Sequence, residues 1–176
     1  GEFAVVDLGA GKPEDYAGRD AAGKLVLCRA PVRDTYLAAV TGRGAAGILF
    51  DHIDATVPGR NRVDLADARQ YSSFWWQPGL AKAWGFVLTP RQGDAISTAL
   101  RRGERVTMRV HIDASFSDGT FEAVAASIPG TASGEVLGIA HLCHPQGFAN
   151  DNASGAACLL ETAVTLHRLI GEGALP

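Results

Sequence analysis

The segment HLCHPQGFANDNASG, residues 141–155, gathers side chains that can bind a metal ion. His141 and His144 stand three residues apart, and Asp151 follows between two asparagines. Imidazole nitrogens and carboxylate oxygens together suit a borderline cation such as zinc. A structural zinc site closes with four protein ligands, usually thiolates and imidazoles, whereas a catalytic site keeps one position open for water. Two histidines and one aspartate therefore indicate the catalytic kind of site.

The residues on either side predict where this segment lies in a fold. The apolar run 136–142 is typical of a strand, and it would deliver His141 to its carboxyl end. Asp151 would precede a helix from about Ser154 to Ile170, whose apolar residues cover most of its surface and predict burial on more than one side. Open α/β sheets build their ligand sites at such strand ends.

The rest of the chain predicts an α/β fold with two domains. Residues 117–119 form a turn that separates a first domain, 1–118, from a second, 119–176, in which 121–128 would pair with 136–142 as a hairpin. Short apolar runs in the first domain predict strands at 3–8, 24–29, 47–50, 85–88 and 105–116, with helices after the capping residues Asp34 and Thr89. The aromatic run 74–76 would either pack on its own domain or contact a neighbouring domain or substrate.

Composition narrows the classes of protein to consider. The chain has 176 residues, a net charge of −3 and 47% hydrophobic residues, which is typical of a globular protein. Nucleic-acid binding would need clustered Lys and Arg, so it is not expected. No run is long and apolar enough to cross a membrane, and no signal peptide is evident, so the compartment stays open. Three cysteines give no disulfide framework.

Residues 23–50 contain the strand GKLVLC, a helical stretch and the turn GAAG followed by ILF. This order resembles the protease-associated domain, whose signature is a Gly-Lys-Ile-Val-Leu strand, a helix and Gly-Ala-Ala-Gly-Val-Ile. The resemblance implies a β-rich α/β domain that serves as a lid or recruiting surface on proteases and does no chemistry itself.

The stretches EVLGIAHLCHP and ANDNASGAACLLE, preceded by VAASIPGT, lie within residues 121–170. They resemble the di-zinc aminopeptidases, a family related to the glutamate carboxypeptidases. The resemblance implies an α/β/α zinc-exopeptidase domain that acts on peptides, of which this chain would hold the first strands and the first helix. A Glu-Glu pair, an Asp and a final His would come from the remainder of the peptidase domain, so the chain by itself is expected to be inactive.

The resemblance gives each residue of the segment a role. His141 would bind one zinc, and Asp151 would bridge both zinc ions of the intact domain. Asn152 and Ser154 would hold the loop and cap the helix, and Gly155 would let the helix pack close to the sheet.

Cys143 stands where the family has an aspartate that does not bind the metal but orients the histidine that does. A protonated thiol does this less well, and His144 follows at once. The sequence therefore leaves open whether His141 or His144 is the zinc ligand.

Two other functions stay open from the sequence. One is a non-catalytic interaction or lid module whose peptidase segment is degenerate, with Cys143 marking the loss. The other is a cysteine hydrolase that uses Cys143 with His144. The cysteine hydrolase is disfavoured because adjacent residues of a strand point to opposite faces and no third, orienting group is evident.

Overall fold

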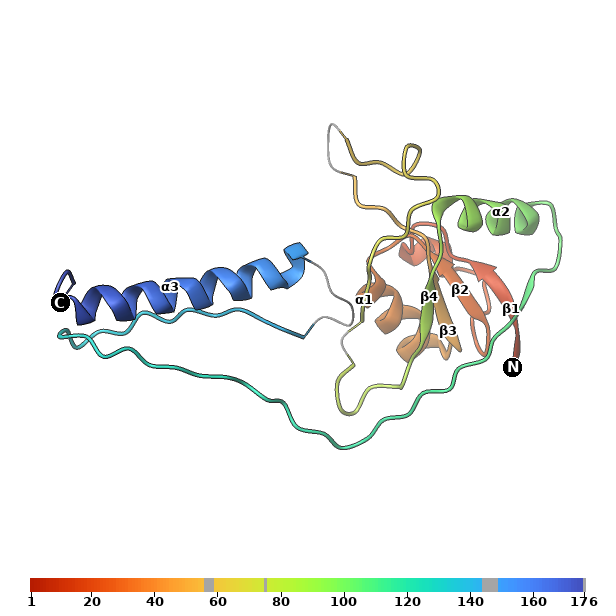
Figure 1. Cartoon of the computed structure of the whole chain (residues 1–176). Coiled ribbons are helices and arrows are strands. Elements are labelled where there is room, and N and C mark those ends of the chain that lie inside the picture. The colour runs from red at the N-terminus through yellow and green to blue at the C-terminus, as the bar shows by residue number, and fades with distance from the viewer. Residues whose placement is uncertain (56–58, 75, 144–148, 176) are drawn as a thin grey trace. The chain divides into compact units, whose positions relative to one another are not determined.

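The computed structural model describes residues 1–55, 59–74, 76–143 and 149–175 (Figure 1). The chain divides into two compact units, Gly1–Ser115 (unit 1) and Phe116–Pro176 (unit 2). These bounds lie close to those of the expected domains, whose family identities stay predictions. None of the helices in the described ranges is both long and apolar enough to span a membrane.

A five-stranded sheet in the order β4-β3-β2-β1-β5 forms the centre of unit 1 (Figure 1). The strands β4, β3, β2 and β1 are parallel, and β5 pairs with β1 in the antiparallel direction. Every residue of β2 and β3 is buried, because these central strands are covered on both faces. The bounds are β1 Glu2–Asp7, β2 Leu25–Cys28, β3 Gly47–Phe50, β4 Gly85–Val87 and β5 Thr107–Arg109.

All five expected strands of the first domain are confirmed, although the last one is much shorter than its apolar alternation predicts. β5 spans three residues in place of the expected 105–116. Its register pairs Glu2 with Arg109, and Gly1 exchanges two backbone hydrogen bonds with Val110 just beyond this pair. The mixed α/β class of this unit is therefore correct, while its protease-associated identity remains a prediction.

The helices of unit 1 show one correct cap and one wrong one. Helix α2, Pro90–Arg101, begins after Thr89, whose side chain accepts a hydrogen bond from the backbone N–H of Gln92 while the Gln92 side chain accepts one from Thr89. Helix α1, Val32–Thr35, continues as the wider turn η2, Tyr36–Thr41. It starts after Pro31 and not at Asp34, because the proline ring fixes a backbone angle that suits a helix entrance.

Phe74, the first residue of the aromatic run, packs against the core of unit 1. Phe74 stacks on Tyr36 with ring centroids 5.1 Å apart, and it packs against the buried cluster around Leu8 and Val26. The Tyr36 hydroxyl donates a hydrogen bond of 2.7 Å to the carbonyl of Ala81. The first alternative, packing on its own domain, therefore holds for Phe74, while residue 75 lies outside the described ranges.

A fully buried carboxylate, Asp51, connects the sheet to the long segment that follows β3. Asp51 is 0% exposed, and its Oδ2 accepts hydrogen bonds from Arg62 at 2.7 Å and from Arg29 at 3.2 Å. A Cβ atom on Gly93 would lie 1.7 Å from the same Oδ2, so only glycine lets helix α2 pack here. Asp51 is therefore enclosed by a strand, a helix and a loop at once.

Arg62 makes the other contacts that fix this loop. Its Nη2 also donates to the carboxylate of Asp94 at 2.7 Å and to the carbonyl of Pro90 at 3.1 Å. Partial burial alone would lower the pKa of Arg62, but the hydrogen bonds to Asp94 and Asp51 outweigh it, and the pKa is raised. The guanidinium thus stays charged and connects the loop to both β3 and α2.

We expect Arg62→Ala to lower the free energy of unfolding of unit 1 by about 1.5–3 kcal/mol, because it leaves a buried carboxylate with fewer donors. Urea titration followed by tryptophan fluorescence measures this, since all three tryptophans lie within residues 1–115. The matched control is Arg91→Ala. Arg91 binds Asp67 with both side chains mostly exposed, so its removal should change stability little. Equal losses for the two variants would contradict the structural role of Arg62.

In unit 2 the expected hairpin is absent. Residues 116–143 are all described and contain no strand. Large apolar side chains of the expected strands are exposed, including Phe121, Val124 and Val136. A two-stranded hairpin is at best marginally stable without a further layer on its apolar face, and the described part of unit 2 supplies none. The strand predictions at 121–128 and 136–142 are therefore wrong for this structure.

The expected helix of unit 2 is confirmed as α3, Ser154–Gly171, but its expected burial is wrong. No described residue of α3 is buried, and Leu160 and Val164 are 67% and 54% exposed. The backbone at Gly138 comes close to the helix, since a Cβ atom there would lie 2.6 Å from Leu159. The described part of unit 2 therefore leaves most of the apolar surface of α3 uncovered.

Candidate functional site

The segment before α3 forms a bent turn, η3, Ala149–Ala153. The backbone leaves helical geometry at Asp151 (φ −122°, ψ 88°) and at Asn152 (φ −139°, ψ 34°). Ala153 occupies the capping position of α3 and offers no side-chain cap, while the Ser154 hydroxyl donates to the carbonyl of Asn150 at 3.3 Å. Ser154 thus ties the helix start to the turn without acting as the expected cap.

Asn152 and Gly155 fit together at the base of this turn. A Cβ atom on Gly155 would lie 2.0 Å from Oδ1 of Asn152. The missing side chain therefore leaves room for the Asn152 amide within the turn, and this local fit is the role that the structure shows for Gly155.

The turn brings Asp151 against His141. Nε2 of His141 lies 3.1 Å from Oδ1 of Asp151, and the two side chains are 49% and 62% exposed. Two ligand atoms of one tetrahedral zinc, each about 2.0–2.1 Å from the metal, stand about 3.3 Å apart. The observed separation therefore suits adjacent ligands of one cation as well as a direct ion pair.

Cys143 lies against the opposite edge of the same imidazole. Its Sγ is 3.7 Å from Nδ1 of His141. Residues two apart in an extended segment point to the same face, which explains why these side chains meet. The family resemblance already placed Cys143 at the position that orients the histidine, and the alternation rule is consistent with this contact, whereas the disfavoured pairing of Cys143 with His144 has no such geometric basis.

His144 lies in 144–148, outside the described residues. In the described part of the chain, no group of three or more His, Cys, Asp or Glu side chains is placed to hold a metal ion. The described site therefore consists of two facing donors, His141 and Asp151, with Cys143 behind the histidine.

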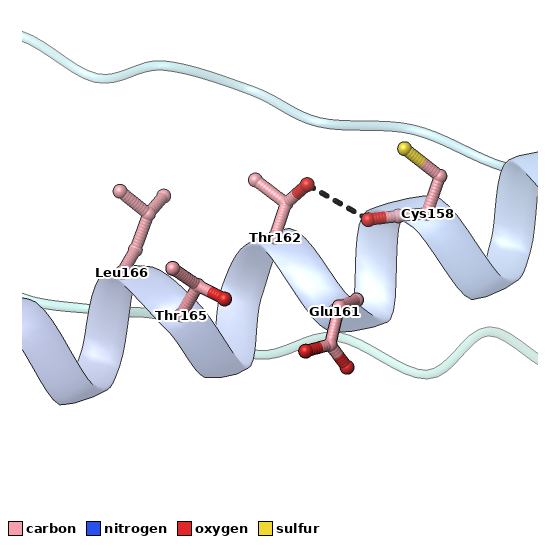
Figure 2. A pocket seen from close by; sticks show the side chains of 5 residues that line it. All are labelled: Cys158, Glu161, Thr162, Thr165 and Leu166. Atoms are coloured by element: carbon pink, nitrogen blue, oxygen red, sulfur yellow. Dashed lines mark hydrogen bonds between the residues drawn. The ribbon is translucent and has the colours of Figure 1, made fainter.

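A shallow hollow on α3 does not coincide with this site. It has a volume of about 340 Å³ and is lined by Cys158, Glu161, Thr162, Thr165 and Leu166 (Figure 2). The Thr162 hydroxyl donates to the Cys158 carbonyl at 2.7 Å, a bond within the helix (Figure 2). None of these residues belongs to the segment 141–155, so the hollow adds no group to the His141–Asp151 pair.

Sequence reasoning missed a second charged cluster, which lies in unit 1. Asp7 ends β1, Arg29 follows β2 and Asp51 follows β3, so three parallel strands present charged residues at their carboxyl ends. Arg29 bonds both Asp51 and the buried hydroxyl of Ser97. The charged residue that follows each of these apolar runs was the signal that could have revealed the cluster. The charged groups of this cluster pair with one another, which indicates a structural role, although Oδ1 of Asp51 has no hydrogen-bond partner among the described residues.

Comparisons with known proteins give one match. No family model matches the chain, and no curated protein matches it. Among solved structures, the aminopeptidase from Aneurinibacillus sp. strain AM-1 is similar, with 25% identity over 60% of this chain and a TM-score of 0.41. The match covers 23% of that aminopeptidase, so the chain corresponds to less than a quarter of it. At this TM-score the likeness does not establish a shared fold.

We expect Gly155→Ala to displace the Asn152 side chain, because the added methyl group would overlap Oδ1. The backbone amide resonances of 149–155 in a ¹H–¹⁵N spectrum should shift. Gly171→Ala is the matched control, since a Cβ atom there meets nothing within 4 Å. Unchanged resonances in Gly155→Ala would show that Asn152 does not occupy this place.

Proposed function

We propose that this chain is part of a zinc-dependent aminopeptidase, with His141 and Asp151 as metal ligands. The observation that carries the proposal is the 3.1 Å separation between Nε2 of His141 and Oδ1 of Asp151. Their side chains are 49% and 62% exposed, so an ion from solvent can reach both atoms. The motif resemblance of residues 121–170 supplies the reaction type, namely removal of N-terminal residues from peptides.

The chain's own groups have distinct tasks in this proposal. His141 offers a neutral ring nitrogen, and Asp151 offers negative charge that offsets the charge of the cation. Ser154 and Asn152 hold the turn that carries Asp151. When bound, zinc lowers the pKa of a coordinated water towards neutrality, which makes it a nucleophile for a peptide carbonyl. Asp151 would also bridge the second zinc of the intact domain, with the remaining ligands outside the described residues.

We expect the chain to retain about one zinc ion after zinc exposure and gel filtration, measured by elemental mass spectrometry. His141→Ala and Asp151→Ala should each lose most of that zinc, because each substitution removes one of the two facing zinc ligands. His167→Ala is the matched control. His167 is an exposed histidine of α3 and lies outside the turn, so its removal should leave the zinc content unchanged.

Two results would contradict the proposal. One is a wild-type chain that retains no zinc, and the other is an equal loss of zinc in His167→Ala and His141→Ala. Either result would favour the alternative function, a non-catalytic interaction or lid module with a degenerate peptidase segment.

A further inference from the structure

We propose that Cys143 is a positioning residue for His141: its sulfur holds Nδ1 of the imidazole, so that Nε2 is directed to Asp151 and the metal. The inference rests on the proposed zinc site and adds a residue that determines how well this site is formed. The geometry that carries it is a row of three side chains, with the imidazole between a sulfur at 3.7 Å and a carboxylate at 3.1 Å.

The exposure of His141 makes such a partner necessary. Its side chain is 49% exposed, so apolar packing does little to fix the ring. The terminal torsion of a histidine side chain is broad, and an unrestrained ring would present either nitrogen or neither to the cation. Contacts at both edges remove this freedom before metal binding, which reduces the entropy lost when the ion binds.

The assignment of the two nitrogens follows from their proton count. A neutral imidazole carries one N–H and one free lone pair. If the metal takes the lone pair of Nε2, the proton resides on Nδ1 and is donated to the Cys143 sulfur. Histidine ligands commonly donate their second ring N–H to an acceptor, which fixes the ring and makes the ligand more basic. Cys143 is the group that occupies this position in the described structure.

The same row of side chains could instead serve a nucleophilic thiol, with His141 as base and Asp151 as the orienting group. Such an enzyme needs a cavity beside the sulfur for the acyl group and donors for the oxyanion. The hollow described above is lined by α3 residues and not by Cys143, so it does not supply that cavity. The positioning role needs no such cavity, so the observations favour it over the nucleophile.

The contact itself can be tested without metal. In the metal-free chain, we expect Cys143→Ala to shift the ¹⁵N resonances of the His141 ring. Cys158→Ala is the matched control, because Cys158 is the other exposed cysteine and lies on α3, away from the turn. Ring resonances of His141 that respond equally to both variants, or to neither, would overturn the inference.

The effect on metal binding is the second test. We expect Cys143→Ala to weaken zinc affinity about 10–100-fold, the usual effect of removing the partner of a histidine ligand. Cys158→Ala should bind zinc as the wild type does, and Cys143→Asp should restore affinity because a carboxylate accepts the Nδ1–H bond. The loss should also depend on His141, so the double variant with His141→Ala should bind no more weakly than His141→Ala alone.

The outcomes separate this inference from the proposed function. If His141→Ala and Asp151→Ala lose zinc but Cys143→Ala does not, the metal site stands and the positioning role is overturned. If none of the three loses zinc, both are overturned. A thiolate-to-cobalt absorption band of the cobalt-substituted chain that is lost in Cys143→Ala would show that Cys143 binds the metal directly. Zinc-independent hydrolysis that is abolished by thiol alkylation and absent from Cys143→Ala would show that it is a nucleophile. Both results would also overturn the positioning role.

Discussion

Unit 1 is organised around one buried charge, the carboxylate of Asp51. A charged group without exposure needs compensating ion pairs, and Arg29 after β2 and Arg62 in the loop after β3 both donate to its Oδ2, while its buried Oδ1 has no hydrogen-bond partner among the described residues. The absence of a side chain at Gly93 completes the enclosure, because it allows α2 to approach. One interaction therefore sets the place of the third strand, the loop that returns to the sheet and the helix above it.

Unit 2 follows a different principle, because the contacts of its turn are mostly polar and close in sequence. The described residues of α3 are not buried, and residues 116–143 form no sheet. What order the turn has comes from pairs close in sequence, such as Ser154 with Asn150 and Gly155 with Asn152. The proposed metal site is thus built from side-chain contacts and not from a rigid core, and this is why a partner such as Cys143 matters for His141.

The two units show why some sequence predictions succeeded and others failed. The strands of unit 1 and helix α3 were predictable because their apolar patterns and caps act over a few residues. The hairpin at 121–128 and 136–142 failed because a strand pattern forms a strand only when another layer covers its apolar face. Arg62 had no local pattern to reveal it, since its partners Asp51 and Asp94 are 11 and 32 residues away in sequence.

The sequence by itself determined the α/β class of unit 1, helix α3 and the set of side chains in 141–155 that could bind zinc. Only the tertiary structure decided how those side chains pair: His141 meets Asp151 through Nε2 and Cys143 through Nδ1. The physical reason is that residue types and spacing fix the chemistry a segment can do. The path of the turn between Ala149 and Ala153 sets which atoms come within bonding distance.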